Sequence, residues 1–217
     1  MNAATSKKPS RRTYGGLSTE ERIAERRERF VEAGLELFGT QGLRSTTVRS
    51  LCKHAGLTER YFYESFTDTE ALFYAVYERE TANLWDFLMK ELQTLPKGLE
   101  ARVPAALNLY FNAMRDERIV RVLILEPMTG GPGLTASHHA NIRLYADLSS
   151  HLFQSDHPDL KLSSEFAFWV AMAINGACSQ LAVQWMLSGY EVPQETVVAS
   201  CATLVMGTIR ELRNSKR

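Results

Sequence analysis

The chain has 217 residues, and 45% of them are hydrophobic, which is enough for one sizeable core or two small ones. Its 25 basic and 25 acidic residues balance, so a strong overall positive field that would attract nucleic acid is excluded. The distribution is uneven, because residues 1–70 hold 12 Lys and Arg against 10 Asp and Glu, whereas the remainder hold 13 against 15. The sign of this asymmetry favours an N-terminal contact with DNA.

Residues 1–17 are basic and rich in small residues, and we expect a disordered arm there. The arm is either a terminus without a role or a flexible extension that contacts phosphates or a minor groove. It does not resemble a secretory signal, because no apolar stretch follows its charges.

The first helix is expected to begin with a capping box, in which Ser18 and Glu21 satisfy each other's backbone amides. It is expected to end at Gly39 or Gly42. One apolar stripe runs along it, formed by Ile23, Phe30, Gly34, Leu37 and Phe38.

The segment 45–66 predicts two short helices joined by a tight glycine turn. Gly56 suits the left-handed position after the first of them, and Thr58 can cap the second. The first helix is expected to have one apolar face, formed by Val48, Leu51, Cys52 and Ala55. The second is expected to bury Phe62 and Phe66. Its outer face would carry Glu59, Arg60, Tyr61 and Tyr63. This is the layout of a helix-turn-helix unit, whose second helix enters a DNA major groove.

A second capping box is expected at residues 67–70, opening a long helix over 68–95. The later helices are expected at 99–114, 119–125, 134–153, 164–188 and 193–214, with a break at 126–133 and a polar loop at 155–160. No alternating strand pattern occurs. The predicted fold is all-α, with a three-helix helix-turn-helix DNA-binding domain at 18–67 and a second helical domain at 68–217.

The stretch from Phe166 to Tyr190 has no charged residue and is long enough to span a bilayer. Asn175, Gln180 and Gln184 lie inside it, which favours a helix buried in the protein or in a subunit interface. The last two helices would leave a large apolar face on a monomer. A two-fold, four-helix interface between copies of the chain, formed by residues 164–188 and 193–214, buries that face most economically, and we expect no membrane span.

The run from Arg26 to Tyr77 resembles the N-terminal domain of the TetR family, the tetracycline-repressor-like regulators. The resemblance covers about fifty residues and implies a dimer with a palindromic DNA site. It also implies an apolar effector pocket, so residues 68–217 are expected to form a helical effector-binding and dimerisation domain. The matching positions are Phe30, Ala33, Leu37, Phe38, Gly42, Thr46, Thr47, Val48, Leu51, Ala55, Gly56, Leu57, Thr58, Tyr63, Phe66, Glu70 and Leu72.

Two positions depart from the family pattern. The family usually has Lys where this chain has Thr69, so a phosphate contact is either missing or made by a hydroxyl. It often has His where this chain has Ser65. Arg60 stands where a small or flexible residue is more usual, and this arginine is a candidate compensation.

The candidate DNA contacts fall on the two short helices and the start of the long one. Arg60 is expected to bind guanine or to remain a solvated charge, and Tyr61 either faces the groove or packs on a neighbouring helix. Glu59 either accepts from cytosine or pairs with an arginine. Tyr63 is the phosphate contact that the resemblance implies. The full set is Thr47, Arg49, Thr58, Glu59, Arg60, Tyr61, Tyr63 and Thr69.

Large side chains in the middle helices indicate either ordinary core or the effector pocket that the family resemblance implies. Gln180 and His138 are further polar groups of interest, and residues 130–133 are a candidate lid. The predicted lining is Trp85, Leu88, Phe111, Met114, Glu126, Met128, Phe168, Met172 and Asn175.

We expect no metal, cofactor or catalysis. The histidine spacings match no ligand pattern, and the three distant cysteines, Cys52, Cys178 and Cys201, indicate reduced thiols in a cytoplasmic protein. Neither a phosphate-binding glycine loop nor a nucleophile elbow occurs.

The resulting hypothesis is a homodimeric regulator, most simply a repressor, that binds a palindromic operator and is released by a small apolar or amphipathic effector. The alternatives are an architectural DNA-binding protein without an effector and an all-helical enzyme that would not bind DNA specifically.

Overall fold

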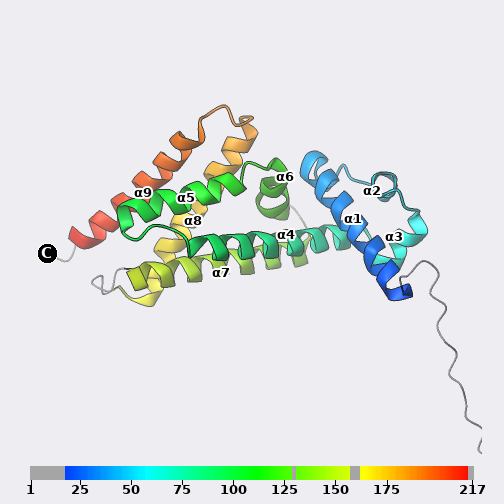
Figure 1. Ribbon diagram of the computed structural model, residues 1–217, viewed down its shortest axis with the longest axis horizontal. Helices are drawn as coiled ribbons and strands as arrows, with labels where there is room; N and C mark the ends of the chain where they lie inside the picture. The colour runs from blue at the N-terminus through cyan, green and yellow to red at the C-terminus, as the bar shows by residue number, and fades with distance from the viewer. Residues whose placement is uncertain (1–17, 129–130, 157–161, 215–217) are drawn as a thin grey trace, which may run out of the picture.

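The computed structural model describes residues 18–128, 131–156 and 162–214, and the ordered structure in these ranges is helical, without strands (Figure 1). The predicted all-α fold is therefore confirmed. The expected basic arm at 1–17 lies outside the described residues. The molecule is elongated, with α1 to α3 at one end and α5, α8 and α9 toward the other (Figure 1).

Helix α1 (Thr19–Gln41) begins as expected. The Glu21 amide donates to the Ser18 hydroxyl at 3.1 Å, and the Glu21 carboxylate accepts from the Ser18 amide, which completes the capping box. The helix ends before Gly42, whose φ of 82° is accessible to glycine. The expected apolar stripe is shorter than predicted, because Ile23 is 40% exposed and burial begins only at Phe30.

Helices α2 (Val48–Ala55) and α3 (Glu59–Ser65) form the predicted helix-turn-helix unit. Thr47 and Ser50 cap α2 reciprocally, and Gly56 adopts the expected left-handed conformation, with φ 62° and ψ 35°. Thr58 occupies the N-cap position of α3, but its side chain makes no capping hydrogen bond, so the predicted cap is wrong. Backbone bonds from Tyr61 and Phe62 to the Thr58 carbonyl begin the helix instead.

Helix α4 (Thr69–Leu92) is capped one residue later than expected. The Asp68 carboxylate accepts from the Ala71 amide at 2.8 Å, so the predicted capping box between Thr67 and Glu70 is wrong. The Glu70 carboxylate instead lies beside Gly131. The helix ends three residues before the expected Leu95.

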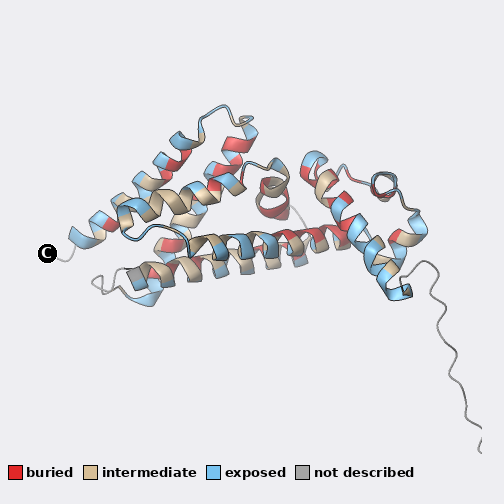
Figure 2. Ribbon diagram, viewed as in Figure 1, coloured by how far each residue is buried: buried red, intermediate tan, exposed pale blue. Residues whose placement is uncertain are grey.

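The first core joins α4 to the three N-terminal helices. Its aromatic centre is Phe30, which meets the ring of Phe62 edge to face at 5.4 Å and that of Phe66 at 6.4 Å. Helix α4 contributes the buried side chains of Leu72, Phe73, Val76 and Tyr77 to this core. Val122, Leu123 and Leu134, from later in the chain, complete it. The helix-turn-helix end is thus built on the same packed unit as the first half of α4 (Figure 2).

The middle of the chain is less regular than the sequence predicts. Helix α5 (Leu99–Ala113) is followed by α6 (Glu117–Val120), the π-helical turn η1 (Arg121–Leu125) and the 3-10 turn η2 (Glu126–Met128). Helix α7 (Pro132–Asp156) begins two residues before the expected position and continues past the expected end at Phe153. The expected loop at 155–160 lies largely outside the described residues.

Helices α8 (Ser164–Leu187) and α9 (Gln194–Asn214) close the fold. Helix α8 packs on α7, and α9 packs on α5 and α8. They build a second core with α5 and α6. Helix α8 is long and apolar enough to cross a bilayer, with a mean hydropathy of 1.5, but so are core helices of water-soluble proteins.

Helix α1 approaches α6 most closely at Gly39. A methyl group at that position would lie 2.4 Å from Cβ and 2.7 Å from Cα of Arg118, so backbone would have to move. We therefore expect Gly39→Ala to reduce the free energy of unfolding by about 1–3 kcal/mol, as overpacking does. Urea denaturation followed by circular dichroism measures this change.

The matched control for this substitution is Gly133→Ala in α7, where an added methyl group meets no atom within 4 Å. This variant should be neutral or slightly stabilising. Equal destabilisation by the two substitutions would contradict the close approach of α1 and α6.

Candidate nucleic-acid interface and effector domain

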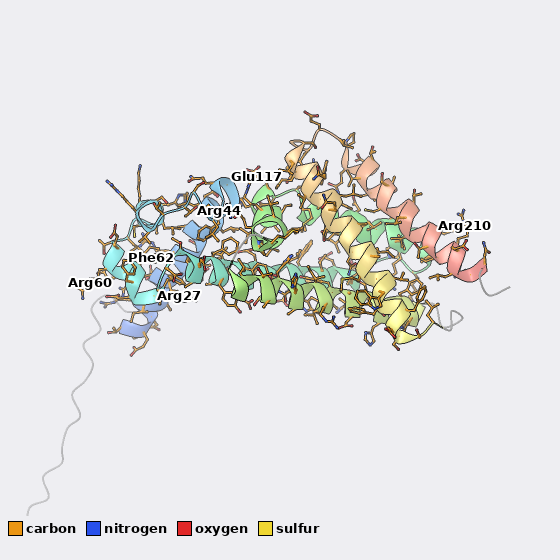
Figure 3. All side chains as sticks on the ribbon, turned by 180° about the vertical axis from the view of Figure 1, so that it is seen from behind. Arg27, Arg44, Arg60, Phe62, Glu117 and Arg210 are labelled. Atoms are coloured by element: carbon orange, nitrogen blue, oxygen red, sulfur yellow. The ribbon has the colours of Figure 1, made fainter. Side chains whose placement is uncertain are left out.

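The outer surface of α3 carries exposed polar side chains, as the sequence predicts. Arg60 extends away from the body of the molecule, whereas Phe62 points into it (Figure 3). The Arg60 side chain is 85% exposed, and its Nε lies 3.5 Å from a carboxylate oxygen of Glu64 one turn later. Such an exposed pair contributes little to stability, so this guanidinium is available to another acceptor. Glu59 and Tyr63 are also exposed.

Tyr61 has a different position from its neighbours. The Arg26 guanidinium carbon lies 4.3 Å from the centre of the Tyr61 ring, which is a cation–π contact between α1 and α3. Arg26 also forms an ion pair with Glu64 at 3.3 Å. Tyr61 is half-buried by this packing, which corresponds to the interpretation in which it rests on a neighbouring helix.

The remaining candidate DNA contacts lie on α2 and at the start of α4. Arg49 is exposed on α2, and Thr47 is exposed, although its hydroxyl already caps that helix. Thr58 is exposed at the start of α3, and Thr69 is half-buried in the first turn of α4. Two further basic residues lie exposed beside these candidates, Arg44 on the loop before α2 and Lys53 on α2 itself, and their positive charge is the signal that the sequence offers for them.

The predicted effector-binding residues are distributed over several packed regions of the helical domain. Phe111 and Met114 are fully buried in the second core. Trp85 is half-buried, with its ring 5.4 Å from that of Tyr145, and Leu88 lies one turn farther along α4.

The predicted residues of α8 are only partly buried. Phe168 lies under the guanidinium of Arg143 at 5.1 Å, and Asn175 exchanges hydrogen bonds with Ser149 at 3.3 and 3.4 Å. Met172, one turn before Asn175, is half-buried as well. These contacts hold α7 against α8.

Glu126 and Met128 lie closer to the DNA-binding end. The Leu43 amide donates to the Glu126 carboxylate at 3.1 Å, and Met128 is 68% exposed. Glu126 therefore contacts the loop that leads into α2 and is placed to hold that loop to η2.

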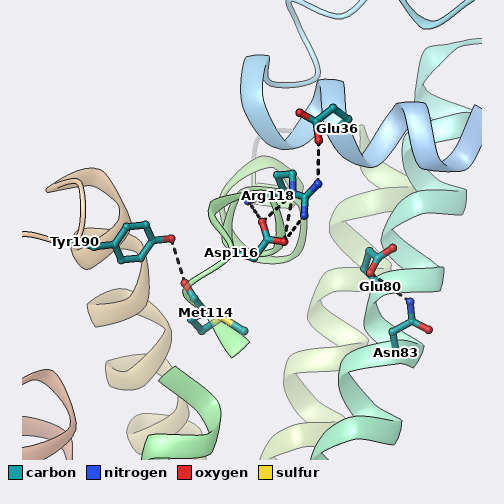
Figure 4. Close-up of polar contacts among 7 residues, drawn as sticks. All are labelled: Glu36, Glu80, Asn83, Met114, Asp116, Arg118 and Tyr190. Carbon is teal, nitrogen blue, oxygen red and sulfur yellow. Dashed lines mark hydrogen bonds and ion pairs between the residues drawn. The ribbon is translucent and has the colours of Figure 1, made fainter. Parts of the chain in front are cut away.

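Two further polar contacts join α6 and η1 to the end of α1. Arg118 donates to Glu36 at 2.9 Å and to Asp116, whose pKa is lowered mainly by that hydrogen bond (Figure 4). Arg121 donates to the Gly39 carbonyl at 3.1 Å. Together with Glu126, these arginines connect the second core to the helix-turn-helix unit.

A polar row between α4 and α7 was largely missed by the sequence analysis. Asn141 donates to the Tyr77 hydroxyl at 3.0 Å, and His138 lies beside the same hydroxyl. Burial lowers the pKa of His138, which favours its neutral form near pH 7. The Tyr145 hydroxyl is buried nearby without a hydrogen-bond partner.

Two hollows occur elsewhere on the described surface. One, of about 200 Å³, lies between the start of α4 and the start of α7, next to Leu43, Glu70 and Tyr74. The other, of about 460 Å³, is an open groove between α8 and α9 beside Phe166, Leu204 and Gly207. Within the described residues, no cluster of three or more His, Cys, Asp or Glu side chains is arranged to hold a metal ion.

Comparison with known proteins identifies the DNA-binding end. Residues 30–76 match the model of the bacterial regulatory proteins of the tetR family. No match was found among curated proteins. The matched residues lie in α1 to α4, so the family match contains the helix-turn-helix unit formed by α2 and α3.

Solved structures extend the likeness to the whole fold. The fatty acid degradation regulator FadR from Bacillus halodurans has a TM-score of 0.72 at 16% identity, over 85% of this chain and 96% of that one. FadR from Bacillus subtilis, in complex with stearoyl-CoA, has a TM-score of 0.69 at 13% identity, over 82% and 96%. A TetR-like regulator from Rhodococcus sp. RHA1 gives 0.68 at 16%, over 86% and 97%.

Identities this low show a shared fold and nothing of the ligand. The family match covers the DNA-binding domain, whereas the likeness to solved structures also covers the helices that follow it. Residues 30–76 therefore correspond to the helix-turn-helix domain of the tetR family, and the chain as a whole shares its fold with TetR-like transcriptional regulators.

Proposed function

We propose that this protein is a homodimeric, ligand-responsive repressor that binds a palindromic operator through α3 and is released by a small apolar or amphipathic effector. The single observation that carries the DNA-binding role is the exposed polar surface of α3, held on a fully buried aromatic core. The proposal includes a cytoplasmic location for the protein.

Dimerisation is supported by the outer surface of α8 and α9. Five large apolar side chains there are between 37% and 58% exposed, which is unusual for helices that end a packed domain; they are Phe166, Trp169, Leu181, Leu187 and Leu204. A second copy of the chain, related by a two-fold axis, would cover them and complete a four-helix interface. The same axis would present two α3 helices to a palindromic site.

The proposed effector class follows from the apolar character of the second core. The stearoyl-CoA complex of the Bacillus subtilis regulator, which shares this fold, supports a ligand with a long apolar part. The effector would enter between α4, α5, α7 and α8, near Trp85, Phe111 and Asn175. Tilting of α4 would then change the distance between the two α3 helices, and an effector that favours the released state by about 1–3 kcal/mol would suffice.

The second candidate function is an architectural DNA-binding protein without an effector. The complete burial of Phe111 and Met114 in the second core favours it, because side chains already fill that space. Thermal denaturation with and without long-chain acyl-CoA separates the two functions. A rise in melting temperature together with release of DNA supports the regulator, whereas no response to any apolar ligand in a broad library supports the architectural protein.

The operator is tested by selecting bound sites from random duplex DNA with the full chain. We expect a recovered palindrome whose two halves are about one helical turn apart. Recovery of no sequence preference would contradict the proposed operator binding.

Arg60→Ala is expected to cost about 1–3 kcal/mol of operator binding and to relax preference at one base position in each half-site. Titration of the selected site and of its single-base variants measures both effects. Tyr63→Phe is the control, because loss of a phosphate contact should weaken all sequences alike. If Arg60→Ala weakened binding to all DNA sequences alike, the proposal that Arg60 reads a base would be wrong.

A further inference from the structure

Two of the three cysteines face each other across the packed helices α8 and α9. Sγ of Cys178 lies 3.6 Å from Sγ of Cys201, and the two residues are only 7% and 1% exposed. The sequence separates them by 22 residues, so only the antiparallel return of α9 on α8 brings them together. Their spacing in the sequence indicates only reduced thiols and gives no sign of this contact.

The contact makes the two sulfurs unequal. The Cys178 thiol donates to Cys201 Sγ, and this hydrogen bond lowers the pKa of Cys201. The same bond, together with burial, raises the pKa of Cys178. Cys201 is therefore the better nucleophile of the pair, because the thiolate is the reactive form of cysteine.

We propose that Cys178 and Cys201 form a reversible intramolecular disulfide when the protein meets a small hydroperoxide. Hydrogen peroxide and small alkyl hydroperoxides are the oxidants that can reach sulfurs this far from solvent during local opening of α8 and α9. The bond would make the paired helices a redox-responsive element, independent of the effector and of the DNA face.

The chemistry balances in two steps. The Cys201 thiolate attacks one peroxide oxygen, a sulfur–oxygen bond forms, the oxygen–oxygen bond breaks, and the alcohol or water leaves with the proton that Cys201 has lost. Sγ of Cys178 then attacks Sγ of the Cys201 sulfenic acid: the sulfur–sulfur bond forms, the sulfur–oxygen bond breaks, and the hydroxide leaves as water with the proton of the Cys178 thiol. The two thiols give up two electrons, and these reduce the peroxide. A dithiol or a monothiol reductant reverses the bond by exchange.

Cys52 provides an internal comparison within the same chain. It is 7% exposed, as Cys178 is, but it lies in the first core among α1 to α4. Burial raises its pKa, which suppresses the thiolate. Because Cys52 and Cys178 are equally exposed, oxidation of Cys178 and Cys201 without oxidation of Cys52 would be due to the contact between the two thiols and not to solvent access alone.

The disulfide would fix the two helices that carry the exposed apolar face described above. The sulfurs must approach from 3.6 Å to about 2.05 Å, through rotation of the two side chains, a small shift of α9 against α8, or both. A shift of α9 would change the surface of the groove between the two helices. This consequence concerns the proposed interface, whereas formation of the bond does not depend on it.

The test treats the full chain with hydrogen peroxide, blocks remaining thiols with N-ethylmaleimide after denaturation, and measures intact mass and proteolytic fragments. We expect loss of two hydrogens, about 2 Da before labelling, a single label on Cys52 and a fragment joining 178 to 201, all reversed by dithiothreitol. Labelling of all three cysteines after exposure, or a crosslink that includes Cys52 or a second chain, would overturn the proposal.

Single variants test whether both sulfurs are required. Cys178→Ala and Cys201→Ala should each lose the fragment joining 178 to 201 and the loss of two hydrogens, because each removes one partner of the bond. Cys52→Ala is the control and should form the disulfide as the original chain does. Loss of two hydrogens in Cys178→Ala or Cys201→Ala, or its absence in Cys52→Ala, would contradict the proposed pair.

Discussion

Replacing Phe62 with alanine is expected to remove about 3–5 kcal/mol of stability, the largest loss from any single change in the helix-turn-helix unit. The ring has 0% exposure and packs edge to face on Phe30 at 5.4 Å and against Phe66 at 5.8 Å. Helix α3 has only seven residues, so it depends on this packing and not on its own propensity. DNA binding should be lost with the helix.

Urea denaturation measured by circular dichroism gives the stability change, and DNA titration gives the functional one. Tyr63→Ala is the matched control, because Tyr63 is adjacent in the same helix and 60% exposed. It should cost less than about 1 kcal/mol of stability while still weakening DNA binding. Equal stability losses for the two variants would show that α3 is not anchored through Phe62.

Leu204→Glu is expected to convert the proposed dimer into monomers. Leu204 is 45% exposed on α9 and lines the groove between α8 and α9. In a two-fold interface each substitution occurs twice, so two carboxylates would be buried without partners. Because both half-sites would no longer be bound together, operator affinity should fall by roughly 10²–10⁴-fold.

Sedimentation velocity and titration of the selected operator measure these two outcomes. Leu144→Glu is the matched control, because Leu144 is a 49% exposed leucine on α7, outside the proposed interface. This variant should remain dimeric and retain affinity. A dimeric Leu204→Glu protein would contradict an interface formed by α8 and α9, whether or not DNA binding changed.

The contacts between α6, η1, η2 and the end of α1 join the helix-turn-helix unit to the later helices at a second place besides α4. Arg121 and Glu126 join this segment to the backbone at Gly39 and Leu43. Its apolar side chains also enter both cores, since Val120 packs in the second core while Val122 and Leu123 pack in the first. A π-helical turn within such a segment is a feature often found at functional sites.

The candidate DNA face was largely predictable from sequence. The reciprocal cap at Ser18 and Glu21 and the left-handed Gly56 depend on residues within a few positions of one another, and local spacing encodes such features. The apolar spacing of α3 likewise indicated that Phe62 faces inward, although its partner Phe30 lies 32 residues earlier. The errors at Thr58 and at the start of α4 are shifts or losses of single caps. Neighbouring donors and acceptors compete there, and the sequence does not rank them.

The same local reasoning does not determine which of the predicted effector-binding residues lie together. Size and apolarity selected Phe111 and Met128 together, yet one is fully buried in the second core and the other is 68% exposed near the DNA-binding end. Composition reports that large side chains are present, but it does not report which of them face one another. The orphan hydroxyl of Tyr145 was invisible for the same reason.

The amino-acid sequence by itself determined that this protein is all helical and carries a helix-turn-helix unit near residue 60, because helix periodicity, caps and glycine turns are local properties of the chain. Only the tertiary structure decided that Arg26 lies over Tyr61, that Glu126 binds the amide of Leu43 and that Cys178 meets Cys201. These pairs are separated by 22 or more residues along the chain. Their distances follow from how whole helices pack, and no local pattern encodes that packing.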